Sequence, residues 1–164
     1  MNKEMLQTLV GKVMKVDRGG PESRIGKLLH VAEDFFTVLT EDDGVVYYRT
    51  QHVKSLTENS KSGLQFDVEV PEVFNYITGE NFDALMGNLQ YQWVNINRGG
   101  PEKLDGVLHS INDDYLTIVK NEEVIRLATY HVKNISYGLK IEKPEEMSNE
   151  NEDNKSKGKS KKDK

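Results

Sequence analysis

The apolar positions at the start of the chain follow two spacings. Over residues 3–10 they recur as on one face of a helix, with Asn2 before them as an N-cap, so the pattern predicts a short helix. From Val13 onward they come in short runs between polar turns, of which Asp43-Gly44 is the clearest, and this pattern is typical of antiparallel strands. The expected strands lie at 13–16, 24–31, 34–40, 45–48 and 52–56.

The second half shows the same succession after a connector. The connector starts as a polar segment, and residues 64–70 then alternate between apolar and polar, which predicts a strand with one buried face. Thr78 or Asn81 is a suitable N-cap for a second helix, whose apolar face is formed by Phe82, Leu85, Met86 and Leu89. Five more strands are expected, at 92–97, 107–111, 115–119, 124–128 and 131–136.

A five-residue motif relates the two halves. Arg-Gly-Gly-Pro-Glu occurs at 18–22 and again at 98–102, an offset of 80 residues. The neighbours correspond as well, and after one residue of slippage His52-Val53-Lys54 matches His131-Val132-Lys133. Because the same spacing holds over about fifty residues, the sequence indicates an internal duplication.

A helix followed by five short strands, with a tight break before the last one, predicts a mainly β fold. We expect tandem duplicated small barrels of the SH3-like or Sm-like kind, each preceded by a short helix, because closing a small sheet removes its exposed edges. A unit of about 60 residues is marginally stable alone, so the two copies should pack together. The predicted parts are a first barrel repeat at 1–58, a connector with an extra strand at 59–77, a second barrel repeat at 78–140 and a disordered tail at 141–164.

The repeated motif predicts a loop between two strands. Its glycines permit positive φ and its proline presets a turn, while its arginine and glutamate would lie near each other and pair weakly. Two interpretations remain open: a structural hairpin loop, or an exposed recognition loop that presents an arginine. The motif lacks the Lys-Ser/Thr end of a phosphate-binding loop. The candidate interaction residues are Arg18, Gly19, Gly20, Pro21, Glu22, Arg98, Gly99, Gly100, Pro101 and Glu102.

Charge and composition narrow the classes of function. The net charge is −5, and the segment from Glu142 onward is neutral, so the folded part carries the negative charge. A general nucleic-acid binder needs a basic face, which makes that class unlikely, although Sm-like strand order keeps it as the alternative function, together with a regulatory adaptor. There is no cysteine, and no run approaches the ~20 apolar residues of a membrane helix. We expect a protein made inside a cell, with no membrane partner.

No combination of residues predicts catalysis or a bound metal. His52 and His131 occupy matching positions, but no further ligands show a recognisable metal-binding spacing, so a structural role at the bend before the fifth strand is expected. Asp42-Asp43 is explained by turn propensity. Ser23 follows the first loop motif, but Lys103 replaces it in the second, so it is a poor nucleophile candidate. We expect neither enzymatic activity nor a cofactor.

The C-terminal segment differs from the rest in composition. An acidic block at 145–153 precedes a lysine-serine block at 155–164, with Met147 as the one large apolar residue. Such a segment buries too little apolar surface to offset its chain entropy, which predicts disorder. It is either an adhesive or modifiable tail, by virtue of its lysines, or a solvated end without a specific partner.

The repeated motif, the Gly-x-Leu that follows it and above all residues 115–136 (YLTIVKNEEVIRLATYHVKNIS) closely resemble the spore coat protein B family of endospore-forming bacteria. The resemblance covers roughly residues 5–139. It implies a non-enzymatic structural component of the outer spore coat, made in the mother-cell cytoplasm and deposited with other spore coat proteins. Assembly would proceed through protein contacts, with self-association as one form of them.

The resemblance also implies a difference from long members of that family. Those members have more repeats, followed by an extended Ser/Lys/Arg-rich tail that is the substrate of a coat kinase. The short tail here offers only Ser156 and Ser160 among lysines as candidate phosphorylation sites. Two phosphates there would largely cancel the local positive charge.

Overall fold

The first unit of the fold consists of one short helix and five strands. The computed structural model describes residues 1–138, so the tail predicted for 141–164 lies outside the described residues. Helix α1 (Lys3–Gln7) starts after Asn2, whose side chain accepts a hydrogen bond from the Glu4 amide at 2.7 Å. The strands are β1 (Val13–Val16), β2 (Arg24–Val31), β3 (Phe35–Thr40), β4 (Gly44–Arg49) and β5 (Leu56–Thr57), with a 3₁₀ turn η1 (Thr50–His52) before β5.

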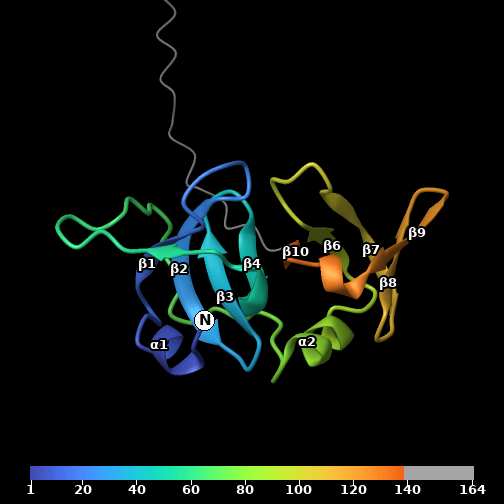
Figure 1. Cartoon of the computed structure of the whole chain (residues 1–164), viewed down its shortest axis with the longest axis horizontal. Helices are drawn as coiled ribbons and strands as arrows, with labels where there is room; N and C mark the ends of the chain where they lie inside the picture. Colours follow the sequence, from blue (N-terminus) through green and yellow to red (C-terminus); the bar gives the residue numbers. More distant parts are fainter. Residues whose placement is uncertain (139–164) are drawn as a thin grey trace, which may run out of the picture.

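The second unit has the same order of elements (Figure 1). Helix α2 (Phe82–Asn88) starts after Asn81, whose side chain accepts a hydrogen bond from the Ala84 amide at 2.8 Å. The following elements are β6 (Trp93–Ile96), β7 (Leu104–Ile111), β8 (Tyr115–Lys120), β9 (Glu123–Ala128), the 3₁₀ turn η2 (Thr129–His131) and β10 (Asn134–Tyr137). Both helices lie at the lower side of Figure 1, and the β1–β2 and β6–β7 loops lie at the upper side.

All ten strands belong to one antiparallel sheet. Its order is β5-β1-β2-β3-β4-β10-β6-β7-β8-β9, so each unit contributes its strands in the same relative order. The two barrels expected from the sequence are not confirmed, because the sheet is open and ends at β5 and β9. Within the described residues, β4 does not close onto its own unit but pairs with β10 of the other. The edge that barrel closure would have removed is covered by the neighbouring unit instead.

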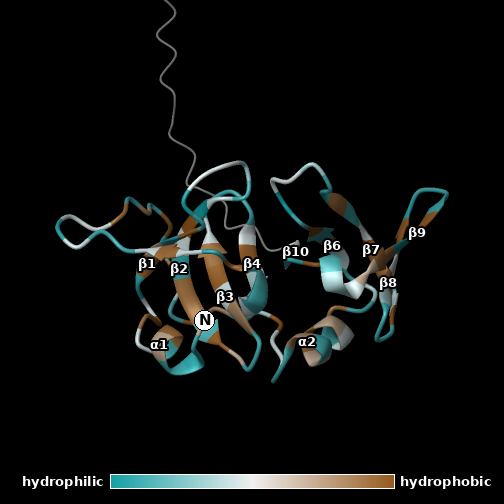
Figure 2. Ribbon diagram, viewed as in Figure 1, coloured by the Kyte–Doolittle hydropathy of each residue, from teal (hydrophilic) through white to brown (hydrophobic). Residues whose placement is uncertain are grey.

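Two apolar cores hold the elements together. Hydrophobic residues of the strands, which are brown in Figure 2, contribute to both cores. The smaller core lies in the first unit, where Leu6 of α1 packs with residues such as Val16, Phe36 and Val46. The larger core contains α2 and the strands of the second unit, but also Phe35 and other residues from the opposite face of β3 and β4. Strand β3 is therefore buried on both faces, and the two units share one core.

The predicted strand in the connector is wrong, although its alternation is right. Leu64, Phe66, Val68 and Val70 are half-buried and the residues between them are exposed, yet 64–70 carry no strand pairing. The segment packs side chains onto the larger core instead of adding its backbone to a sheet edge. Further on, the Tyr47 hydroxyl donates a hydrogen bond to the Ile77 carbonyl, and burial raises the pKa of that hydroxyl.

The fifth strand of each unit also differs from the expectation. The sequence predicted strands over 52–56 and 131–136, whereas the structure begins each segment with a 3₁₀ turn. Strand β5 retains only Leu56–Thr57, while β10 extends over Asn134–Tyr137. The longer strand is the one with partners on both sides, β4 and β6, which explains why it is more regular.

Substitution of Gly106 tests the tight strand packing of this sheet. A Cβ at Gly106 would lie 2.6 Å from Cγ2 of Ile118 and 2.8 Å from the carbonyl oxygen of Val119, so the neighbouring strand must move. We expect Gly106→Ala to lower the free energy of unfolding by about 1–3 kcal/mol, measured by urea denaturation. Gly87→Ala, in α2 with nothing within 4 Å, is the control and should stabilise by up to about 1 kcal/mol. Equal stability of the two variants would contradict the packing argument.

Candidate interaction surface

The two Arg-Gly-Gly-Pro-Glu loops meet at the boundary between the units. We call this contact the junction: strand β4 and loop 17–23 on one side, strand β10 and loop 97–103 on the other. Gly99, at φ +84°, leaves no room for a side chain, because a Cβ there would overlap the Pro21 carbonyl. Gly100 is buried and faces the Glu22 carboxylate. The glycine end of the second loop therefore docks on the Pro-Glu end of the first.

Asp43 is the charged centre of the junction. Its carboxylate accepts hydrogen bonds from Arg24 of its own unit, at 2.6 Å, and from Arg98 of the second loop. The Asp43 side chain is only 8% exposed, so two cations satisfy one nearly buried anion. Burial opposes the charge of Arg24, but the hydrogen bond and charge of Asp43 outweigh this effect and raise the pKa of Arg24.

Arg98 also fixes the β10 side of the junction. Its Nε donates to the Ser136 hydroxyl at 2.7 Å, and its amide donates to the side chain of Asn134 at 3.1 Å. Glu22, which the sequence paired with Arg18, forms its ion pair with Lys133 at 3.0 Å instead. The two copies of the motif thus make different contacts. Arg98 of the second copy and Glu22 of the first copy each form an ion pair across the junction.

The 3₁₀ turns add further contacts between the units. Arg49 donates from its amide to the Lys133 carbonyl at 3.0 Å and from its guanidinium to the Thr129 carbonyl at 2.8 Å. A ring nitrogen of His52 lies 3.0 Å from the Tyr130 carbonyl oxygen. Burial, together with the positive charge of Arg49, lowers the pKa of His52, which favours the neutral ring. His52 ends the 3₁₀ turn at the bend before β5, where the sequence placed it, and it also contacts the other unit.

The other ends of the two loops remain accessible. Arg18, Gly19 and Gly20 are exposed, and so are Pro101 and Glu102. Within residues 1–138, no ion pair includes Arg18 or Glu102. Of the candidate residues, the structure therefore brings Pro21 and Glu22 together with Arg98, Gly99 and Gly100. Partner binding by the free ends stays a prediction, and Ser156 and Ser160 lie outside the described residues.

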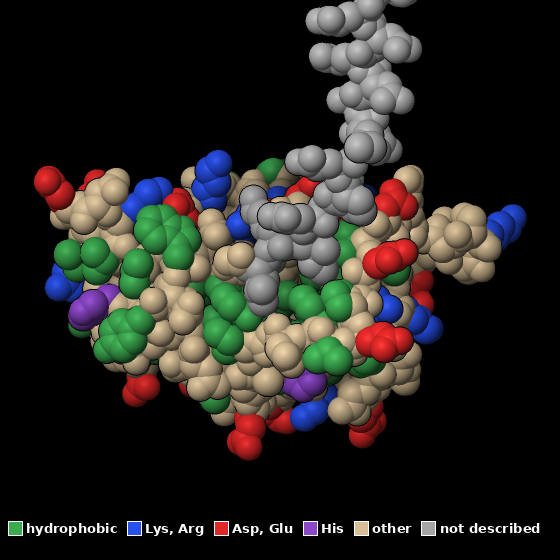
Figure 3. Space-filling view, turned by 180° about the vertical axis from the view of Figure 1, so that it is seen from behind, with side chains coloured by type: hydrophobic (Ala, Val, Ile, Leu, Met, Phe, Trp, Pro, Cys, Tyr) green, Lys and Arg blue, Asp and Glu red, His purple; other side chains and the backbone are tan. Residues whose placement is uncertain are grey.

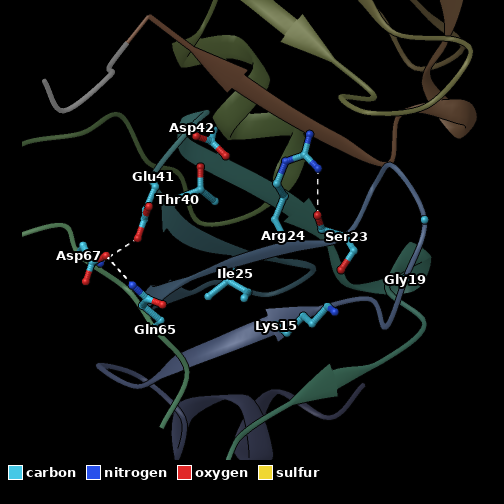
Figure 4. Close-up of a pocket in the computed structure, with 11 residues that line it drawn as sticks. Lys15, Gly19, Ser23, Arg24, Ile25, Thr40, Glu41, Asp42, Gln65 and Asp67 are labelled. Atoms are coloured by element: carbon cyan, nitrogen blue, oxygen red, sulfur yellow. Dashed lines mark hydrogen bonds between the residues drawn. The ribbon is translucent and has the colours of Figure 1, made fainter. Parts of the chain in front are cut away.

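A shallow, polar hollow of about 620 Å³ lies beside the first loop (Figure 4). Lys15, Ile25 and Thr40 project into it from the sheet, and Gln65 and Asp67 border it from the connector. A hydrogen bond holds the connector here, because the Asp67 amide donates to the Glu41 carboxylate at 2.7 Å. The lining mixes both signs of charge and contains no adjacent nucleophile and base.

Two structural findings bear on other classes of function. Among the described residues, no three histidine, aspartate or glutamate side chains converge in a way that would hold a metal ion. No helix in residues 1–138 has the length and apolar character needed to cross a membrane.

The sequence did not predict the role of Asp43 at the junction, because Asp43 has the position of a turn residue. A signal was present, since Arg24 has no arginine counterpart at Leu104.

Gly99→Ala is expected to open the junction. The substitution combines a positive φ with overlap of the Pro21 carbonyl, so it should cost at least about 2 kcal/mol in the free energy of unfolding. Amide hydrogen exchange should also show faster exchange in β10. Gly19→Ala is the matched control, because Gly19 holds the same place in the other loop and has nothing within 4 Å. If both variants behave alike, the docking of the loops is wrong.

Asp43→Asn keeps the side-chain shape but removes the anion that both arginines share. We expect a loss of about 3 kcal/mol, at the lower end of the range for breaking a buried ion pair because both arginines are partly exposed. Urea denaturation measures the change. The exposed neighbour Asp42 provides the control, and Asp42→Asn should be close to neutral. A loss below that of the control would show that the two ion pairs contribute nothing.

Comparisons with known proteins complete the description. No protein-family model matches the chain, and no solved structure matches it. The chain is 36% identical over 143 residues, or 87% of its length, to "Spore coat protein B" of Bacillus subtilis (strain 168). The aligned part spans 37% of that relative's own length. The extent and level of this identity show that the chain is related to the spore coat protein B family.

Proposed function

We propose that this chain is a non-enzymatic structural component of the bacterial spore coat that assembles through protein–protein contacts. The observation that carries the proposal is the 36% identity over 87% of the chain to spore coat protein B. The matched part is 37% of that relative's length. Deposition in the outer layer, after synthesis in the mother cell, belongs to the same proposal.

The architecture supports a role in presenting surfaces. The ten strands form one continuous sheet whose outer edges and loop ends are accessible, whereas the hollow beside the first loop is shallow and polar. At the far end of the sheet, apolar side chains are exposed, and Figure 3 shows green side chains at that end, on the left of the view. The exposed large apolar residues of the second unit are Tyr91, Trp93, Tyr115, Val124 and Tyr130. Exposed apolar surface of this kind favours protein contacts.

The proposal predicts where the protein accumulates. A fluorescently tagged copy of the full chain, produced in sporulating Bacillus subtilis, should collect around the forespore while the coat forms and should be recovered from mature spores with the coat fraction. Tagged Gly87→Ala, which we expect to keep the fold, is a suitable control for effects of substitution. A signal that stays diffuse in the mother cell throughout coat formation would contradict the proposed function.

A further inference from the structure

We propose that copies of this chain join head to tail, with strand β9 of one copy pairing with strand β5 of the next as β4 pairs with β10 inside the chain. The partner is thus a second copy of the chain. The inference rests on the proposed function, because it specifies the contact by which such a protein would assemble. The junction within the chain serves as the template for the contact between chains.

Among residues 1–138, the sheet leaves one edge of each kind without a partner strand. In the order β5-β1-β2-β3-β4-β10-β6-β7-β8-β9, β4 and β9 are the last strands of their units, and β5 and β10 are the first. The β4 and β10 edges pair with each other, so β9 and β5 form the two ends of the sheet. An edge strand presents unpaired amide and carbonyl groups, which are suited to pairing with another strand.

The exposure of the strand residues shows the same difference between the paired edges, β4 and β10, and the free edges, β9 and β5. Strand β4 is buried along its length except at Arg49, whereas β9 is exposed or half-buried throughout. Val45 of β4 is 0% exposed, and Val124, at the corresponding position of β9, is 56% exposed. Strand β5 is half-buried, while the corresponding residues of β10 are buried. Each outer edge thus leaves accessible the positions that the junction buries.

The loops are complementary in the same sense. At the junction, the Arg-Gly-Gly end of one loop docks on the Pro-Glu end of the other. The two ends left over are the Arg-Gly-Gly end of the first loop, which follows β1 next to β5, and the Pro-Glu end of the second loop, which leads into β7. A second copy placed head to tail would bring these two ends together.

The strand registers identify which side chains would meet. Gly44 pairs with Thr40 and Glu123 with Lys120, so Glu122 corresponds to Asp43. The counterpart of the Arg98–Asp43 pair is then Arg18 with Glu122. By the same matching, Lys133–Glu22 corresponds to Lys54 with Glu102. The two ion pairs that cross the junction thus have counterparts of the same charges at the two free edges.

A third pair changes its chemistry but stays complementary. Tyr47 stacks on Tyr137 across the junction, with ring centroids 6.2 Å apart. Thr37 pairs with Tyr47 and Thr117 with Arg126, and Glu58 follows β5 as Tyr137 ends β10. The stacked rings are therefore replaced by Arg126 and Glu58, which carry opposite charges. Glu58 now forms an exposed ion pair with Lys12 at 3.1 Å, a weak contact that it can exchange.

The predicted contact is heterologous, since a different surface is used on each side. Every added copy presents a new β9 or β5 edge, so association does not stop at a dimer, and it ends only if the rotation closes a ring. Opposite charges at three positions favour this arrangement over other pairings of the same edges. The order of strands and the ion pairs thus point to the same assembly.

Two half-blocked variants of the full chain test the proposal. Ala128→Pro blocks β9: its φ of −59° suits proline, and Ala128 corresponds to Arg49, whose amide bonds to Lys133 across the junction. Arg18→Glu combined with Lys54→Glu blocks β5 by opposing Glu122 and Glu102. Sedimentation velocity should show species larger than a dimer for the unmodified chain. Each variant alone should be monomeric, with self-association weakened by more than about tenfold.

The decisive sample is an equimolar mixture of the two variants. One intact β5 edge and one intact β9 edge remain in it, so a dimer and nothing larger should form. A chain that carries Arg18→Glu and Lys54→Glu together with Glu102→Lys and Glu122→Arg is the matched control, because both ion pairs return with their signs reversed. It should associate like the unmodified chain. If Ala128→Pro unfolds the protein, as circular dichroism would show, Arg126→Glu replaces it as the β9 variant.

Three results would overturn the head-to-tail contact: a monomeric unmodified chain, a dimer of either half-blocked variant alone, or a mixture that stays monomeric. A dimer of one variant alone would indicate a symmetric contact instead. These results do not depend on the proposed function. A chain that reaches the spore coat but does not self-associate would leave the function standing and remove this contact, and the reverse outcome would do the opposite.

Discussion

The pairing of β4 with β10 is the interaction on which the rest of the structure depends. It joins the backbone of two strands that are far apart in the sequence, so the two units become one sheet. It also places Asp43 between Arg24 and Arg98 and lets the opposite face of β3 and β4 enter the core of the second unit. Without this pairing, a small unit would have to stabilise an exposed edge and a buried carboxylate by itself.

The same five residues behave differently in the two loops because their surroundings differ. Arg98 is held by Asp43 and Ser136, and Arg18 is exposed. Gly99 takes the positive φ in the second loop, whereas Gly20 takes it in the first. A pair of glycines lets one motif adopt either conformation. The duplicated motif thus forms a contact between the units in one place and exposed surface in the other.

The sequence predicted correctly those helices and strands whose formation depends on neighbouring residues. Strands β1 and β2 have the predicted bounds, and Asn2 and Asn81 cap the two helices as their positions suggested. The errors concern segments whose conformation depends on distant partners. Residues 64–70 alternate like a strand but pack on a core face that only the assembled sheet provides. The closed barrels are not confirmed for a similar reason, because β4 pairs with β10 of the second unit.

For this protein, the sequence by itself determined the relationship of the two halves, the positions of the helices and most strands, the two Arg-Gly-Gly-Pro-Glu loops and the resemblance to a coat family. These follow from periodicity, turn chemistry and residue identity, which are properties of neighbouring residues. The tertiary structure decided which edges pair, which half of each loop is covered and that Asp43 binds two arginines. Those outcomes depend on residues about 20 to 90 positions apart meeting in space, and no local pattern encodes such a meeting.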